Sequence, residues 1–269
     1  MWLIFTVAAG LLLQEGAAAA PVTISAASSL KEALLEAADA FAARGGTHVQ
    51  FNFGATGRLL AQIRHRAPVD ALIAASDEQM RQAEALHLVD PASRTVIASN
   101  RLVLIAPREA KVPVESFERL SDPAIKRLAI GEPRTVPAGQ YARQVLRALD
   151  LEASLQGRIV HGGNVRQVLD YVERGEVDAG IVYLTDAKQA GDSVRIVAEA
   201  KANWHDPIRY VAATIRGSGR ADEVGGFIRF LTGDAGQKLL ASHGFAPATE
   251  ATTRKTENSS TKGTKGTNE

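Results

Sequence analysis

The chain has 269 residues, of which 45% are hydrophobic and 23% are charged, and its formal net charge is +1. This composition is typical of a globular protein with one large domain or two modest ones, and the near-neutral charge argues against a nucleic-acid partner, which would need a basic face. The chain contains no cysteine, which excludes disulfides, cysteine-ligated zinc and iron–sulfur clusters.

The first twenty residues are typical of an export signal. Residues 1–13 are nearly all apolar, and the small residues at 16–20 suit cleavage by a signal peptidase. The apolar run is shorter than the roughly 20 residues that span a bilayer as a helix. No Lys or Arg precedes it, so a late start site or a buried N-terminal strand is the alternative. We expect residues 1–20 to be removed, leaving a soluble periplasmic protein that is a monomer.

Strand and helix patterns alternate from residue 22 to about residue 248. Short runs of apolar and β-branched residues predict strands at 22–25, 49–53, 71–75, 102–106, 127–131, 179–183 and 211–215. Apolar residues at helical spacing predict helices that include 30–41, 59–63, 141–149, 165–172, 227–231 and 239–240. This alternation predicts an α/β fold with largely parallel sheets. Residues 250–269 are mostly polar and are expected to form a disordered tail.

Four strand-to-helix junctions place small or hydroxyl-bearing residues at the start of a helix. They lie at residues 26–30, 53–57, 136–140 and 162–166. A helix N-terminus has free backbone N–H groups and a partial positive charge, so each junction could bind an anion. The carboxyl ends of strands are also where α/β proteins usually bind ligands. Several junctions meeting in one crevice would enclose a dianion without any Lys or Arg.

Ordinary helix capping is the alternative interpretation of these junctions. Ser, Thr, Asn and Gly begin helices in many proteins without binding any ligand. Ser29 and Glu32 fit the capping box, in which a Ser or Thr is followed three residues later by Glu. Spacing along the chain does not separate four independent caps from four converging groups.

The same segments resemble, in order, those of the periplasmic molybdate-binding proteins of bacterial ABC importers, which are type II periplasmic binding proteins. The most specific strings are Val-Pro-Ala-Gly-Gln-Tyr-Ala at 136–142 and Gly-Ile-Val-Tyr-Leu-Thr-Asp-Ala at 180–187. The resemblance implies a two-lobed α/β flytrap, each lobe a mixed, mostly parallel sheet flanked by helices, with two chain crossovers. We expect one lobe to contain residues 21–101 and 209–249 and the other residues 102–208.

The resemblance also implies the groups that bind the oxyanion in the cleft. They are the hydroxyl and N–H groups of Ser29 and Thr56, the N–H groups of Ala138 and Val165, and the phenol of Tyr183. Molybdenum would be held as molybdate through its oxygens, with no direct protein–metal ligand and no cofactor. Thr56 stands where the family pattern predicts a serine, which leaves the volume of the pocket and its selectivity open.

Each of these groups can donate a hydrogen bond, and none is an obligate acceptor. A fully deprotonated dianion needs only donors, whereas a protonated phosphate would bring a proton that meets no acceptor. Leaving a buried polar group unpaired costs ~1–3 kcal/mol, so we expect phosphate and arsenate to bind poorly. Sulfate carries no proton at neutral pH and could be rejected only by its size.

Other residues with chemical potential have structural interpretations. The six His residues do not fall at metal-ligand spacing. Four carboxylates could suggest acid–base catalysis, namely those of Asp70, Asp77, Asp178 and Asp186. Carboxylates around an anion would repel it, so caps or hinge bonds explain them better. Arg166 could neutralise an anion, and Trp204 and Tyr210 near the second crossover are expected to pack.

The predicted function is that of a periplasmic solute-binding protein, not an enzyme. It would capture molybdate or tungstate in an interlobe cleft and deliver it to the membrane permease of an ABC importer. A carrier of another oxyanion, such as sulfate, is the first alternative, and a sensor that contacts a receptor is another. An enzyme acting on a phosphorylated small molecule is less favoured, because the sequence contains no nucleophile elbow or Walker motif.

Overall fold

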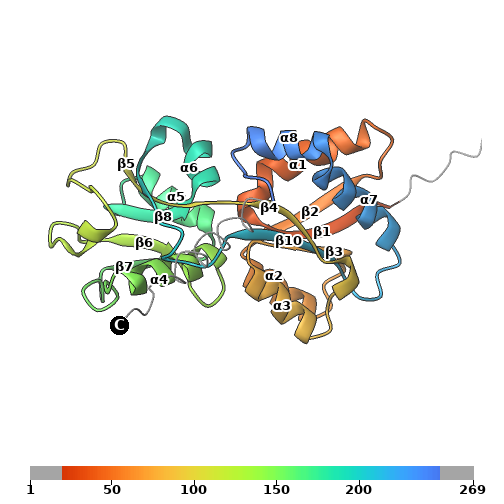
Figure 1. Cartoon of the computed structure of the whole chain (residues 1–269), viewed down its shortest axis with the longest axis horizontal. Coiled ribbons are helices and arrows are strands. Elements are labelled where there is room, and N and C mark those ends of the chain that lie inside the picture. The colour runs from red at the N-terminus through yellow and green to blue at the C-terminus, as the bar shows by residue number, and fades with distance from the viewer. Residues whose placement is uncertain (1–19, 249–269) are drawn as a thin grey trace, which may run out of the picture.

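The computed structural model describes residues 20–248. All but the last residue of the predicted export signal lie outside the described residues, as does the predicted tail at 250–269. The described residues form two five-stranded sheets that lie side by side, each flanked by helices (Figure 1). Within this part of the chain, no helix is both long and apolar enough to cross a membrane.

The first sheet has the strand order β2-β1-β3-β10-β4. Its strands are β1 (Val22–Ala27), β2 (Val49–Gly54), β3 (Ala71–Ala74), β4 (Thr95–Ser99) and β10 (Arg209–Thr214). β1 pairs in parallel with β2 and β3, whereas β10 pairs antiparallel with β3 and β4. Four of the five strands therefore run in one direction, and β10 alone is reversed.

The second sheet repeats this arrangement in the order β7-β6-β8-β5-β9. Its strands are β5 (Leu102–Pro107), β6 (Leu128–Gly131), β7 (Ile159–Gly162), β8 (Ala179–Tyr183) and β9 (Val194–Glu199). β6 pairs in parallel with β7 and β8, and β5 pairs antiparallel with β8 and β9. The reversed strand here is β5, the strand by which the chain enters this sheet.

Helices follow most of the parallel strands and flank the sheets. The helices around the first sheet are α1 (Lys31–Ala42), α2 (Thr56–Arg64), α3 (Asp77–Ala85), α7 (Ala221–Thr232) and α8 (Asp234–Ser242), with the short 3₁₀ helices η1 (Ser28–Leu30) and η2 (Pro91–Ser93). The helices around the second sheet are α4 (Pro137–Ala148), α5 (Val165–Glu173), α6 (Leu184–Ala190), η3 (Glu118–Ser121) and η4 (Gly191–Ser193). α1, α7 and α8 lie on one side of the first sheet, and α2 and α3 lie on the other (Figure 1).

Both faces of the first sheet are buried, as the residues of β3 show. Ala71 and Ile73 belong to the core that also contains residues of α1 and α7. Leu72 and Ala74 belong to a second core, formed with α2 and α3. Successive side chains of a strand point to opposite faces, so an unbroken apolar run supplies two cores at once. This is why the strand is apolar throughout rather than alternating.

The chain passes between the two sheets twice. The first crossover is at Asn100–Arg101, between β4 and β5, and the second is at residues 200–208, between β9 and β10. The predicted α/β fold with two lobes and two crossovers is therefore confirmed. We call the part around the first sheet the first lobe and the part around the second sheet the second lobe. The residue boundaries expected for the lobes stay a prediction.

Three strands were not predicted from the apolar pattern: β4, β7 and β9. All three lie at an edge of a sheet. Edge strands have one unpaired side and less buried surface, so they need fewer apolar residues. β9 illustrates this, because its first residue, Val194, is the one buried residue of the strand.

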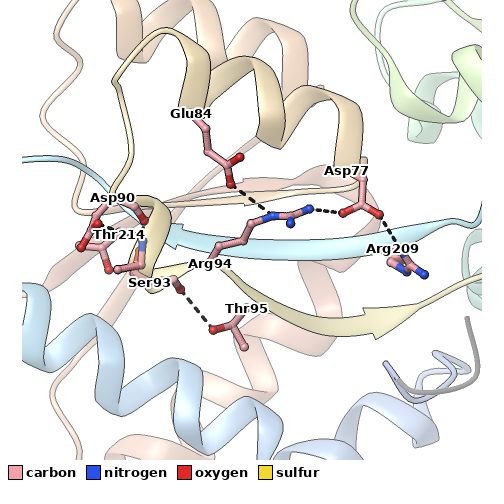
Figure 2. A network of polar contacts seen from close by, with 9 residues as sticks. Asp77, Glu84, Asp90, Ser93, Arg94, Thr95, Arg209 and Thr214 are labelled. Atoms are coloured by element: carbon pink, nitrogen blue, oxygen red, sulfur yellow. Dashed lines mark hydrogen bonds and ion pairs between the residues drawn. The ribbon is translucent and has the colours of Figure 1, made fainter. Parts of the chain in front are cut away.

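A polar network within the first lobe links the start of β10 to α3 (Figure 2). Asp77, the first residue of α3, forms ion pairs with Arg94 at 2.5 Å and with Arg209 at 3.1 Å. Arg94 also pairs with Glu84 at 3.3 Å. A carboxylate in the first turn of a helix is favoured by the helix dipole, so Asp77 suits its position. The network fixes Arg209 and with it the next residue, Tyr210, where the second crossover ends.

Candidate functional site

A small pocket lies where helix starts from both lobes meet. Its lining residues are mostly small and uncharged: Ala27, Ser28, Ser29, Gly54, Ala55, Thr56, Ala75, Val136, Pro137, Ala138, Val165 and Tyr183. The pocket has a volume of about 10 Å³, close to what one water needs. All five residues that the resemblance implied as ligand-binding line this pocket, so the four junctions converge at one place.

Each junction directs the N-terminus of a helix toward the pocket. Ser29 lies in η1, Thr56 is the first residue of α2, Ala138 is the second residue of α4, and Val165 is the first residue of α5. The first N–H groups of a helix have no acceptor within that helix. Side chains do not cap η1, α2 or α4, and in α5 the Asn164 side chain caps only the N–H of a later residue, that of position 167.

The capping-box interpretation of Ser29 and Glu32 is wrong. Helix α1 begins at Lys31, and its cap residue makes no side-chain capping bond. The Oγ of Ser29 lies instead 2.8 Å from the Oη of Tyr210. Glu32 forms an ion pair at 2.5 Å with Arg166 of the second lobe. Both side chains therefore connect distant parts of the chain rather than the first turn of α1.

The hydroxyl of Thr56 is positioned to donate into the pocket. The side chain is fully buried, and its Oγ1 accepts a hydrogen bond from the N–H of Ala75 at 3.2 Å. Because that bond uses a lone pair of the oxygen, the hydroxyl proton stays available for a second partner. Thr56 thus presents both its backbone N–H and its hydroxyl proton at the start of α2.

The hydroxyl of Tyr183 is buried and has no hydrogen-bond partner among the described residues. Burial raises the pKa of this phenol well above its usual range, so it keeps its proton and can donate. A buried polar group without a partner costs ~1–3 kcal/mol, and such groups are rare in native proteins. Since Tyr183 lines the pocket, its missing partner is best explained by an acceptor that comes from outside the chain.

No residue lining the pocket is charged. Arg166, next to Val165, is engaged elsewhere: besides Glu32, its Nε lies 2.9 Å from the Oδ1 of buried Asp186. The Nε–Oδ1 contact lacks hydrogen-bond alignment, so charge attraction is what holds this pair. Burial raises the pKa of Asp186 to about 6, and the neighbouring Arg166 opposes that rise. The suggestion that Arg166 neutralises an anion in the pocket is not supported by this geometry.

The carboxylates that could have suggested catalysis are used in structural contacts. Asp70 accepts a bond from the N–H of Thr23, and Asp178 accepts bonds from the two backbone N–H groups just before β6. Asp77 and Asp186 are in the ion pairs described above. In residues 20–248 no group of three or more His, Cys, Asp or Glu is placed to hold a metal ion.

The two lobes touch directly beside the pocket at Gly57. Its N–H donates to the carbonyl oxygen of Thr135, which precedes α4, at 2.9 Å. A Cβ on Gly57 would lie 2.8 Å from both the Cα and the oxygen of Thr135. Only glycine allows this close approach between two backbones.

Two further residues near the pocket were not recognised from the sequence. The ring of Tyr210 packs against Phe245 as expected, but its hydroxyl also contacts Ser29. Asn100 in the first crossover, which no motif marked, contacts Tyr210. Trp204 does pack, with its ring centroid 5.8 Å from that of Phe117. Neither role has a signal along the chain, because the partners that define it, Ser29 and Thr185, are distant in sequence.

Comparison with known proteins agrees with this geometry. Residues 22–246 match the family of bacterial extracellular solute-binding proteins. The molybdate-binding protein ModA of Haemophilus influenzae is 35% identical over 234 residues, which cover 86% of this chain and 91% of that protein.

Solved structures show the same fold at lower identity. The periplasmic molybdate-binding protein of Azotobacter vinelandii has a TM-score of 0.75 at 23% identity, and the match covers 84% of this chain and 98% of that one. The sulfate-binding protein SubI of Mycobacterium tuberculosis has a TM-score of 0.71 at 17% identity, with 84% and 86% covered. The chain therefore belongs to the bacterial extracellular solute-binding protein family and is a relative of the molybdate-binding protein ModA.

Proposed function

We propose that this protein captures molybdate or tungstate in the pocket between its lobes and delivers the anion to the membrane permease of an ABC importer. Ser29, Thr56, Ala138, Val165 and Tyr183 would bind the oxygens of the anion. The observation that carries the proposal is the unpartnered, buried hydroxyl of Tyr183 in a pocket otherwise built from helix N-termini.

The chemistry of the lining favours a fully deprotonated anion. The hydroxyl proton of Thr56 is available because its oxygen already accepts a bond from Ala75. Tyr183 stays protonated, and the backbone groups at the helix starts can only donate. Hydrogen bonds to a charged group contribute ~1.5–3 kcal/mol each, so about five to seven of them can offset the dehydration of a dianion.

Movement of the lobes would give the anion access. An oxyanion with four oxygens is larger than one water, so the walls of the pocket must separate for it to enter. The crossovers at Asn100–Arg101 and 200–208 connect the lobes, and a rotation there would part the two groups of donors. Because the pocket has no Lys or Arg, the anion can leave when the lobes open.

Export and delivery are part of the same proposal. Residues 1–20 would direct the chain to the periplasm, where the mature protein would act as a monomer. The family match is to extracellular proteins, which supports export. The pocket lining includes Tyr183 but no carboxylate, His or Lys that could act in acid–base catalysis, and this favours binding over turnover.

Sulfate is the ligand that competes most closely with molybdate. SubI, which shares the fold, is a sulfate-binding protein, and sulfate also needs only donors. Thr56 lines the pocket and carries a methyl group that a serine would lack, so this residue would affect which anion fits. We expect Thr56→Ser to change molybdate affinity less than about threefold, because the hydroxyl donor is kept, whereas relative sulfate affinity responds to the removed methyl. Calorimetric titration of wild type and variant with both anions measures this.

A thermal-unfolding panel tests the proposed function. Purified protein lacking residues 1–20 would be heated with molybdate, tungstate, sulfate, phosphate or citrate. A ligand at 100 times its dissociation constant stabilises by ~2.7 kcal/mol, which raises the melting temperature by several degrees. Stabilisation by molybdate and tungstate alone is the expected result. Stabilisation by sulfate to the same extent would make this protein a general carrier of tetrahedral dianions. No response to any oxyanion would contradict the proposal.

A further inference from the structure

Two buried polar residues connect both crossovers to the pocket. Asn100 lies in the first crossover, directly after β4, and Tyr210 is the second residue of β10, where the second crossover ends. Tyr210 is fully buried, and Asn100 is 9% exposed. The Oη of Tyr210 is 3.1 Å from the Nδ2 of Asn100 and 2.8 Å from the Oγ of Ser29. A continuous chain of hydrogen bonds therefore runs from a crossover to a pocket residue.

The first link of this chain has a fixed direction. The backbone N–H of Arg101 donates to the Oδ1 of Asn100 at 2.8 Å, and an N–H can only donate. The other side of the carboxamide must then be its NH₂ group. That group donates to the Oγ1 of Thr185 at 2.9 Å and to the Oη of Tyr210 at 3.1 Å. Both protons of the amide are used, and Tyr210 is made an acceptor.

The second link follows from the first. Burial raises the pKa of Tyr210 far above its usual range, so the phenol keeps its single proton. The oxygen of Tyr210 already accepts from Asn100, and its proton is directed to the Oγ of Ser29, 2.8 Å away. Ser29 then accepts this bond, and its side chain makes no other hydrogen bond within residues 20–248. The proton of Ser29 is left for the pocket that this residue lines.

We propose that Tyr210 and Asn100 are positioning residues that orient the Ser29 hydroxyl as a donor toward the bound oxyanion, and so help to exclude protonated oxyanions. The inference rests on the proposed function, because it concerns the same pocket. A free serine hydroxyl can either donate or accept, and as an acceptor it could take the proton of a hydrogen phosphate. The bond from Tyr210 occupies one of the two lone pairs of the Ser29 oxygen and leaves the Ser29 proton for the anion, so Ser29 is a poorer acceptor for the proton of hydrogen phosphate.

Two substitutions remove the groups that orient the Ser29 hydroxyl but keep Ser29 itself. Tyr210→Phe keeps the ring, which packs against Phe245 at a centroid distance of 5.2 Å, but deletes the hydroxyl. Asn100→Leu deletes the amide that makes Tyr210 an acceptor. Thr185→Val is the matched control, because it removes the other acceptor of the same amide and leaves the bond between Asn100 and Tyr210 in place. Circular dichroism would show that each variant is folded before binding is measured.

The test is the ratio of phosphate to molybdate dissociation constants, measured by calorimetry at one pH. We expect Tyr210→Phe and Asn100→Leu each to lower this ratio by about tenfold, because Ser29 becomes a better acceptor for the phosphate proton. Thr185→Val is expected to leave the ratio within about twofold. A wild-type ratio that is kept in the folded Tyr210→Phe variant would overturn the inference even though molybdate binding persists. Wild-type protein that binds no oxyanion would instead overturn the proposed function, and the inference with it.

Discussion

The first and second lobes present hydrogen-bond donors to the pocket in different ways. In the first lobe, the hydroxyl oxygens of Ser29 and Thr56 are already bonded, to Tyr210 and to the N–H of Ala75. In the second lobe, the Tyr183 hydroxyl has no partner among the described residues. The first lobe thus carries an oriented half of the pocket, and the second lobe carries a half that an anion would complete.

This difference bears on how binding energy can be used. Donors that are oriented before the anion arrives lose little freedom when it binds, which favours affinity. A buried donor without a partner lowers the stability of the unliganded form and is satisfied only when an acceptor arrives. Binding to the first lobe and closure of the second over the anion would follow from these properties.

The largest effect is expected when one donor is removed from each half. Ser29→Ala combined with Tyr183→Phe deletes two bonds to a charged ligand, each contributing ~1.5–3 kcal/mol. Molybdate affinity should therefore fall by about a hundredfold or more. Calorimetric titration measures this, with Tyr171→Phe at a half-buried position of α5 as a matched control for the loss of a phenol. Unchanged affinity in the double variant would show that the pocket is not the binding site.

A buried carboxyl group in the second lobe should make stability depend on pH. The folded-state pKa of Asp186 is raised from 3.8 to about 6, so the folded protein holds this proton more tightly than the unfolded chain does. As pH rises from about 4 to about 6, the unfolded chain loses the proton first, and the contribution of Asp186 to stability falls.

Asp186→Asn removes this titration. Relative to wild type, the variant should gain stability as pH rises from 4 to 6, by at most ~1.4 kcal/mol for each step of one in pH. Above pH 6 the difference between the two proteins should be constant. Urea unfolding at several pH values measures it. A difference that does not vary between pH 4 and 6 would mean that Asp186 ionises like an ordinary carboxyl.

The contact between the halves can be broken at Gly57. In Gly57→Ala the new Cβ would lie 2.8 Å from backbone atoms of Thr135, so the lobes could not approach as closely. We expect molybdate affinity to fall by roughly tenfold, the equivalent of about one bond to a charged ligand, with little change in unliganded stability. Gly219→Ala, where the Cβ would meet nothing within 4 Å, is the control. Equal affinities of the two variants would argue against closure at this contact.

The smallest expected effects are on the stability of the unliganded protein, and they should have opposite signs for a variant in each half of the pocket. Tyr183→Phe removes an unpartnered buried hydroxyl. It should raise the free energy of unfolding of the unliganded protein by up to ~1 kcal/mol, and its melting temperature with it. Ser29→Ala takes the acceptor away from Tyr210 and should lower stability by a similar amount. Thermal unfolding of the two single variants without ligand tests this. Changes of the same sign would remove the distinction between an oriented and an unsatisfied half.

Much of the fold was predictable because it depends on short-range periodicity. The central strands are mostly apolar, and most of the helices have apolar residues at regular spacing, so both could be recognised. Helices α3 and α6 were not predicted, because α3 is mostly polar and α6 has only seven residues. The edge strands β4, β7 and β9 could not be recognised, because a strand with one free edge needs fewer apolar residues. The burial of Asp186 could not be predicted either, because nothing in its neighbours along the chain shows that its carboxylate is completely buried.

The sequence by itself determined that four strand-to-helix junctions have small or hydroxyl-bearing residues, since such junctions are local features of the chain. Only the tertiary structure decided that these junctions meet in one pocket, that Glu32 pairs with Arg166, and that Ser29 bonds to Tyr210. The last two contacts join residues 134 and 181 positions apart in the chain. The direction in which a hydroxyl donates depends on such distant partners, because its proton rotates toward whichever acceptor the folded chain brings near.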